Sequence, residues 1–204
     1  MNFPLIPVDP IKSISQRALL AYWDHAANGQ FFPTLEQFRP DDRTHDPKQL
    51  VFWQVETISP RERRFRALHQ GDHVAQVFGQ HWSGRTMDQV VPEFGRAIAL
   101  GGADECARSG CAVYTILSTV DPSGRPVDCE RLLLPLGRQG KVEHLVGSLQ
   151  LISVSGEFRR ETVLSSFQLR TEVTCSGKIR SSGQSGAAAA TGIRRDLEGD
   201  LGWS

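Results

Sequence analysis

Two histidines four residues apart, His69 and His73, are the first candidates for metal chemistry in this sequence. Residues spaced in this way share one face of a helix, where paired imidazoles bind zinc. Gly71 separates the two histidines at a predicted strand-to-helix junction, however, and the sequence has no HExxH or HxH pattern. We therefore predict no metal site.

Four cysteines are the next candidates, and their spacing indicates structural rather than catalytic roles. They lack the close pairs of a zinc ribbon and are few for a secreted disulfide scaffold. No electropositive neighbourhood that would activate a thiolate is evident around any of them. We expect them to behave as small hydrophobic residues: Cys106, Cys111, Cys129 and Cys175.

Acidic residues and serines form no recognisable catalytic group. The sequence has no paired carboxylates with acid/base spacing, no G-x-S-x-G elbow and no glycine loop followed by Lys-Ser/Thr. One alternative stays open, in which a single buried acid transfers a proton. Glu130 lies on a predicted strand, but the sequence does not decide which face of the sheet it occupies.

Composition describes a chain with no strong global charge. The 204 residues include 23 Lys and Arg and 23 Asp and Glu, so no overall field favours nucleic acid or an anionic membrane. The N-terminus lacks the basic and apolar regions of a signal peptide, and no apolar run approaches the ~18 residues of a membrane span. We expect a cytoplasmic protein that binds neither nucleic acid nor membrane.

Hydrophobic periodicity predicts the elements that would position any site. Apolar residues at helical spacing follow Ser13 or Ser15, and Asn28-Gly29 is suited to end that helix. A pair of strands, short helical segments, a longer helix and three further strands should follow. Their expected ranges are Val51–Ile58, Arg64–His69, the region after Gly71, Pro92–Gly110, Cys111–Val120, Val127–Leu136 and Val142–Val154.

The C-terminal fifty residues are less regular. Alternation near Phe167–Val173 fits a strand, whereas Glu157–Leu169 fits an amphipathic helix equally well. Gly, Ser and Ala dominate from Ser176 to Ala190, so we expect the chain to be flexible after about residue 175. The predicted organisation is an N-terminal extension with a helical cap (1–49), a core (50–154) and a C-terminal tail (155–204).

Several small motifs follow one another in a fixed order along the chain: Tyr22-Trp23, Gly29, Pro33, the strand Val51–Ile58, Phe65-Arg66, Gly71, Gly79, Gly84, Glu130–Leu136 and Gly147. Their order resembles that of a bacterial PAS-domain family common in alphaproteobacteria. The resemblance covers Ile14 to Ile152, with Asp72 in place of an expected Thr and a poor match at Phe38–Asp46.

The resemblance implies an α+β PAS fold, in which a five-stranded antiparallel sheet carries helices on one face and an N-terminal helix caps the domain. Aromatic residues on the cavity-facing elements then become candidates for a ligand pocket, although they serve equally well as ordinary core. These candidates are Trp53, Phe65, Phe78, Trp82 and Tyr114. Tyr22 and Trp23, on the leading helix, become candidates for a partner or dimer interface.

The implied function is that of a non-enzymatic sensory or regulatory module acting in trans in bacterial signal transduction. Its expected partners are a histidine kinase or another regulator, a second copy of the chain, or a small-molecule ligand. The cofactor is left open: the longer helix has no His for haem, and the Asn-Cys-Arg motif of a flavin adduct is absent. Two alternatives remain, a small α+β enzyme with a buried acid or base in the sheet cavity and a ligand-free interaction module.

Overall fold

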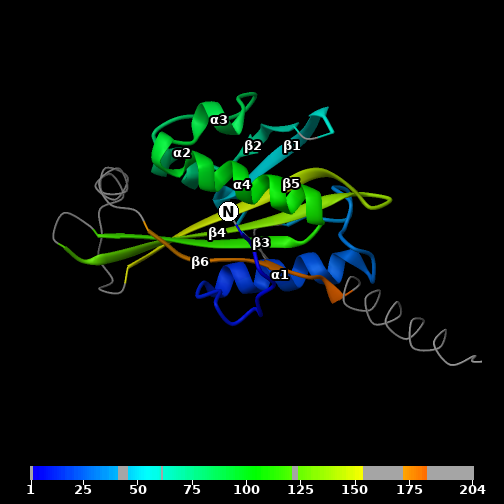
Figure 1. Cartoon of the computed structure of the whole chain (residues 1–204), viewed down its shortest axis with the longest axis horizontal. Coiled ribbons are helices and arrows are strands. Elements are labelled where there is room, and N and C mark those ends of the chain that lie inside the picture. The colour runs from blue at the N-terminus through cyan, green and yellow to red at the C-terminus, as the bar shows by residue number, and fades with distance from the viewer. Residues whose placement is uncertain (1, 41–45, 61, 121–123, 154–171, 183–204) are drawn as a thin grey trace, which may run out of the picture.

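One antiparallel sheet organises the structure, a computed structural model that describes residues 2–40, 46–60, 62–120, 124–153 and 172–182. Its six strands lie in the order β2-β1-β5-β4-β3-β6 (Figure 1). The strands are β1 (Leu50–Ser59), β2 (Glu62–Gln70), β3 (Ala112–Val120), β4 (Pro126–Arg138), β5 (Lys141–Ser153) and β6 (Glu172–Ile179). The helices are α1 (Ile14–Ala27), the 3₁₀ turn η1 (Pro47–Gln49), α2 (Asp72–Phe78), α3 (Met87–Val90) and α4 (Glu93–Ser109).

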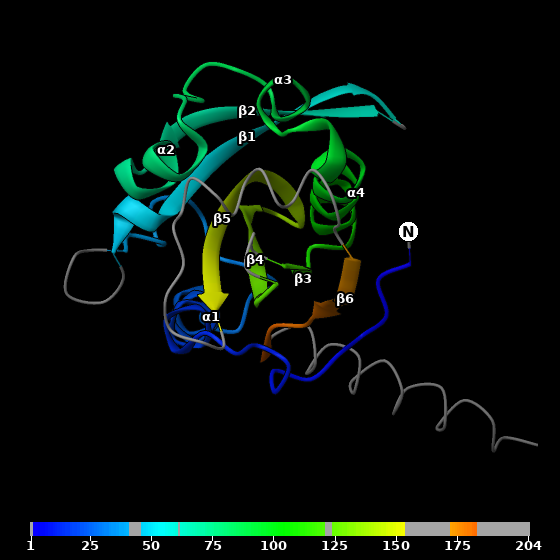
Figure 2. The ribbon, with the colours of Figure 1, turned by 90° about the vertical axis from the view of Figure 1, so that its left-hand side faces the viewer.

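The helices lie on both sides of the sheet. Figure 1 shows α4 and α1 on opposite sides of strands β3 to β5, and Figure 2 shows α2, α3 and α4 grouped over one face. Side chains alternate between the two faces of a strand. In the central strand β4, Leu133 therefore faces α4 and the other helices of its group, while Leu132 and Leu134 face the side that α1 covers; all three are buried.

The predicted order of elements is confirmed, but the sheet has six strands rather than five. The prediction of a flexible chain after about residue 175 is wrong for Ser176–Ile179, which belong to β6 and pair with β3. Glycine here serves a close contact rather than flexibility, because a Cβ on Gly177 would lie 2.5 Å from a methyl carbon of Ile6. The candidate helix Glu157–Leu169 and most of the predicted tail, residues 155–171 and 183–204, lie outside the described residues.

The N-terminal segment covers the outer edge of β6. The backbone N–H of Ile6 donates to the Lys178 carbonyl at 2.9 Å, and the Lys178 N–H donates to the Pro4 carbonyl at 2.7 Å. Lys178 also reaches across to helix α4, where its Nζ lies 2.7 Å from a carboxylate oxygen of Glu105. The two ends of the described chain are therefore held together at one edge of the sheet.

Helix α1 begins and ends as its sequence predicts. The Ser13 side chain accepts a hydrogen bond from the Gln16 N–H, and Asn28 ends the helix in the left-handed region at φ 48°. The helix is fastened to β4 through the Ser13 N–H, which donates to Glu130 Oε2 at 3.0 Å, and through the Gln16 side chain, which donates to the Glu130 carbonyl. Lys12 and Asp128 form an adjoining ion pair at 2.6 Å.

The structure contradicts the predicted interface role of Trp23. Its side chain is fully buried, and its indole N–H donates to the Pro135 carbonyl at 2.8 Å. Tyr22 is half-buried, packs against Phe38 with ring centroids 5.3 Å apart, and donates a hydrogen bond to the Arg39 carbonyl. The aromatic side chains of α1 pack against other residues of the same chain. Trp23 could therefore contact a partner only if this packing were lost.

We predict that Trp23→Ala lowers the free energy of unfolding by ~3–5 kcal/mol, because it empties a buried aromatic site. Trp23→Phe should cost less and isolates the lost hydrogen bond to Pro135. The measurement is chemical denaturation followed by circular dichroism. Ile14→Ala on the same helix is the control, since that side chain is 77% exposed, and equal midpoints for the Trp23 and Ile14 variants would contradict this packing.

Candidate functional site

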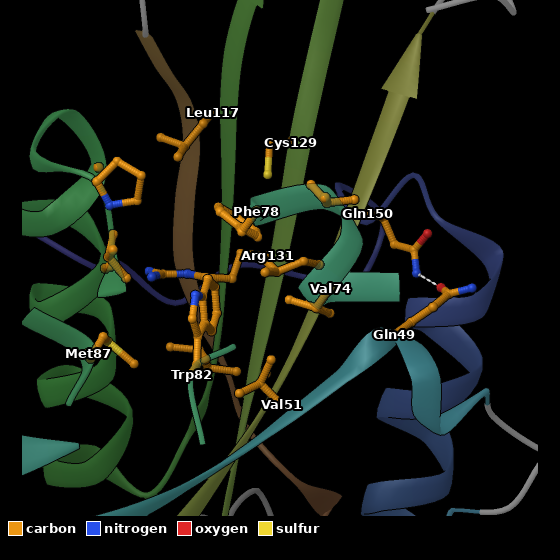
Figure 3. A pocket seen from close by; sticks show the side chains of 18 of the residues that line it. Gln49, Val51, Val74, Phe78, Trp82, Met87, Leu117, Cys129, Arg131 and Gln150 are labelled. Atoms are coloured by element: carbon orange, nitrogen blue, oxygen red, sulfur yellow. Dashed lines mark hydrogen bonds between the residues drawn. The ribbon is translucent and has the colours of Figure 1, made fainter. Parts of the chain in front are cut away.

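A cavity of about 200 Å³ lies between the sheet and the group of helices α2, α3 and α4 (Figure 3). Its floor comes from β1, β3, β4 and β5, and its roof comes from the three helices. The lining is mainly aliphatic and aromatic. Its apolar members are Val51, Trp53, Val74, Val77, Phe78, Trp82, Met87, Val91, Pro92, Ile98, Ala99, Leu117, Leu133, Leu149 and Leu151.

Three of the five predicted pocket residues meet at this cavity. Trp82 lies between the other two, with ring centroids 5.7 Å from Trp53 and 4.7 Å from Phe78. Phe65 is buried on β2 but does not line the cavity. Tyr114 lies on the opposite face of the sheet, because it pairs with Leu132 on the side that α1 covers, and its hydroxyl donates to the Pro10 carbonyl at 3.2 Å.

Gly147 lies in the floor of the cavity, where it pairs with both Val51 on β1 and Leu133 on β4. A Cβ at this position would lie 3.5 Å from Trp53 Nε1 and 3.4 Å from a methyl carbon of Leu133, which is ordinary van der Waals contact. The indole of Trp53 therefore lies directly against this strand.

Arg131 is a charged group in this apolar lining, and sequence reasoning missed it. It lies on β4 between Cys129 and Leu133 on the cavity face, and one guanidinium N–H donates to the Ile98 carbonyl on α4 at 3.0 Å. Burial lowers its pKa to about 10, which still leaves the group charged at neutral pH. Within the described part of the chain, no carboxylate forms an ion pair with it. The available signal was an arginine in phase with Cys129 and Leu133 on a strand rich in leucine.

Gly102 on α4 creates the space that the guanidinium occupies. A Cβ at this position would lie 2.4 Å from Arg131 Nη2, which is closer than any real contact. The neighbouring Gly101 has open space around it. Of these two adjacent glycines, Gly102 therefore has a specific role, which is to let an arginine lie against the helix backbone.

Polar groups at the rim of the cavity come from η1, α2 and β5. The Gln150 side-chain amide donates to the Gln49 side-chain carbonyl, as Figure 3 shows. His73 lines the same side, with Nδ1 3.5 Å from a carboxylate oxygen of Asp46. Among the described residues, no group of three or more His, Cys, Asp or Glu side chains could hold a metal ion.

Glu130, the acid on which the enzyme alternative would depend, faces away from the cavity. It is fully buried beneath α1, where Oε2 accepts the Ser13 N–H and Oε1 has no hydrogen-bond partner. Burial and the nearby Glu130 carboxylate raise the pKa of Tyr114. None of the described residues that line the cavity is Asp or Glu. A ligand in the cavity therefore meets an arginine and a cysteine rather than an acid.

Comparison with known proteins identifies the family. The sequence profile described as PAS domain matches residues 11–150. No curated protein matches the chain. Within the described residues, no helix has the length and apolar character needed to cross a membrane.

The family match confirms the predicted PAS fold. Several solved structures are similar to the chain at low sequence identity. The Rhodobacter sphaeroides LOV protein is 14% identical, with a TM-score of 0.37, and the alignment covers 71% of each chain. The Vibrio cholerae VqmA–ligand–DNA complex is 14% identical, with a TM-score of 0.34 over 61% of this chain and 55% of that one. An RNA-binding light-oxygen-voltage receptor is 16% identical, with a TM-score of 0.33 over 60% of this chain and 36% of that one.

These structures correct one expectation. The balanced charge led to the prediction of no nucleic-acid partner, and that prediction is contradicted because VqmA is seen in complex with DNA. Net charge sums over a whole chain, whereas contact with a phosphate backbone depends on where lysines and arginines cluster. A neutral total is therefore no ground for excluding this class of partner.

We predict that Cys129 reacts slowly with iodoacetamide in the folded protein, because burial raises the pKa of its thiol to about 12. At pH 8 such a thiol is ionised in roughly one molecule in ten thousand, against about one in four for a pKa near 8.5. The measurement is alkylation resolved by peptide mass spectrometry, with the urea-unfolded chain as control. A native rate at Cys129 equal to its unfolded rate would show that the thiol is activated or accessible.

Proposed function

The chain belongs to the PAS domain family, and we propose that it is a sensory module that binds a small molecule in the cavity beneath α2, α3 and α4 and signals by contact. The observation that supports this proposal is the cavity itself. A volume of about 200 Å³ lies among side chains between the sheet and the helices, whereas protein interiors ordinarily contain few voids larger than a water molecule. Binding requires no chemical change in the ligand.

The size and lining of the cavity favour a compact, partly apolar ligand. An engineered cavity of about 150 Å³ lined by aliphatic and aromatic residues binds benzene, so a space of about 200 Å³ accommodates a single ring with a small substituent. Trp53, Phe78 and Trp82 would supply flat apolar surfaces for such a ring. A ligand-free interaction module would have no need to keep this space open.

Strand β4 offers a route from the cavity to α1. Arg131 faces the cavity, while its neighbour Glu130 accepts the Ser13 N–H at the start of α1. Asp128, two residues earlier, holds Lys12 in the same segment. A ligand that moves β4 by a small amount would alter these contacts, provided that it binds one arrangement of α1 more tightly than the other. The output would then be a change in the surface around α1.

The cavity proposal predicts that Ala99→Leu weakens small-molecule binding by roughly tenfold or more, because the larger side chain fills part of the space. Ala97→Leu is the matched control, since Ala97 is exposed on the same helix. The probes are indole and phenol as neutral rings and benzoate as an acid, measured by ligand-observed NMR. Native mass spectrometry of the protein from its own cells would detect a retained molecule. The absence of a retained molecule, together with probe binding that is insensitive to Ala99→Leu, would favour the interaction module.

The route through β4 makes a separate prediction. Saturation with a probe that binds the cavity should change hydrogen exchange of backbone amides at Ser13–Arg17, since these residues begin the helix that β4 holds. The change should disappear in Ala99→Leu at the same probe concentration. Exchange at β2 serves as the internal reference. An unaltered α1 in the ligand-saturated protein would remove α1 as the output element.

A further inference from the structure

We propose that the cavity takes an acid, namely a small molecule with an apolar, ring-sized body and one carboxylate or similar anionic group that pairs with Arg131. This inference rests on the proposed function, since it names the class of molecule that the cavity would bind. Three observations support the inference. Arg131 has no ion-pair partner among the described residues, the indole N–H of Trp82 has no acceptor, and Gly102 on α4 leaves space for the guanidinium.

The first argument is the uncompensated charge of Arg131. A guanidinium carries five N–H donors, and here one of them donates to a neutral acceptor, the Ile98 carbonyl. Among the described residues, no Asp or Glu forms an ion pair with it, and none lines the cavity. A charge removed from water without a counterion is costly, so a ligand that supplies the negative charge would gain from filling this gap.

The second argument is an indole donor without an acceptor. Trp82 Nε1 is buried and has no hydrogen-bond partner in the described structure. Trp82 and Arg131 both line the cavity and are both drawn among its labelled side chains in Figure 3. Both groups are hydrogen-bond donors, and the described lining has no carboxylate that could accept from them. An oxygen-bearing anion offers only acceptors, and a carboxylate can accept two parallel N–H bonds from one guanidinium.

The third argument is that the arginine is held in place before any ligand arrives. Gly102 leaves the space that Nη2 occupies, and the Ile98 carbonyl, one helical turn earlier, accepts its hydrogen bond. A residue placed only to fill space on β4 would not need a missing side chain on the facing helix. Preorganisation of this kind reduces the entropy lost when an anion binds.

The test compares benzoate with benzamide, which matches it in size and lacks its charge. Binding of each probe is measured by isothermal titration calorimetry on the full chain at fixed ionic strength. We expect benzoate to bind at least tenfold more tightly than benzamide. Arg131→Met should remove that preference, weakening benzoate by roughly tenfold to a hundredfold while changing benzamide by less than about threefold.

Gly102→Ala gives a second test that leaves the charge in place. Its Cβ would displace the far end of a flexible side chain while its other contacts stay above 3.4 Å, so the fold should be retained. We expect benzoate binding to weaken by about fivefold or more. Gly101→Ala is the control, because nothing lies near its added Cβ, and it should bind benzoate as the unaltered chain does.

Thermal unfolding of the ligand-free variants separates a binding role from a structural one. If Arg131 serves a ligand, Arg131→Met should unfold at the same temperature or higher, because an apolar side chain replaces a half-buried charge that has no ion-pair partner among the described residues. A large drop in unfolding temperature, with benzoate binding retained in Gly102→Ala, would show that the arginine supports the fold and would overturn the proposal.

The outcomes also distinguish this proposal from the function on which it rests. If indole or benzamide binds as tightly as benzoate and Ala99→Leu weakens all three, the cavity is a ligand site but not one for acids. If benzoate binds more tightly and loses its advantage in Arg131→Met, both proposals are supported. If no probe binds in a way that Ala99→Leu affects, both are overturned.

Discussion

Strand β4 is buried on both faces, and the rest of the structure is arranged around that constraint. One face carries Leu132, Leu134 and Leu136, all fully buried, beneath α1 and the N-terminal segment. The other carries Leu133 and the residues that line the cavity beneath α4. A strand with two apolar faces must be covered twice. The N-terminal helix is therefore a structural layer of the domain and not an appendage.

This arrangement places two environments one residue apart. Glu130 lies in a closed polar pocket where the start of α1 supplies its hydrogen bond, whereas Arg131 lies in the cavity against α4. The strand places a carboxylate on one face of the sheet and a guanidinium on the other, so the two groups point in opposite directions. The charge of each must be balanced within its own layer. On the α1 side the backbone and Lys12–Asp128 contribute to that balance, while on the cavity side the anion is missing from the described residues.

The aromatic residues illustrate what periodicity can and cannot decide. Trp53, Phe78 and Trp82 were predicted to line a pocket and do so. Tyr114 was placed with them, yet its strand presents it to the other face, since a shift of one residue exchanges the two sides of a sheet. Trp23 was predicted to face a partner. The apolar stripe of its helix was recognised correctly, but a stripe does not indicate whether the surface that covers it belongs to the same chain.

Local rules in the sequence determined the elements themselves. Ser13 and Asn28 bound α1, alternation marks the strands from Val51 to Val146, and the order of the segments predicts the PAS fold. Tertiary structure decided which residues meet at the cavity and at the edge of the sheet, because these contacts join residues that are distant in the chain. Gly177 in β6 leaves the space that Ile6 of the N-terminal segment occupies, and Gly102 accommodates Arg131 from 29 positions away. Burial of a charge, and the absence of its partner, exist only once separate segments enclose it. For that reason the sequence carries only a weak signal for Arg131, its position in phase with Cys129 and Leu133, and the fold decides its environment.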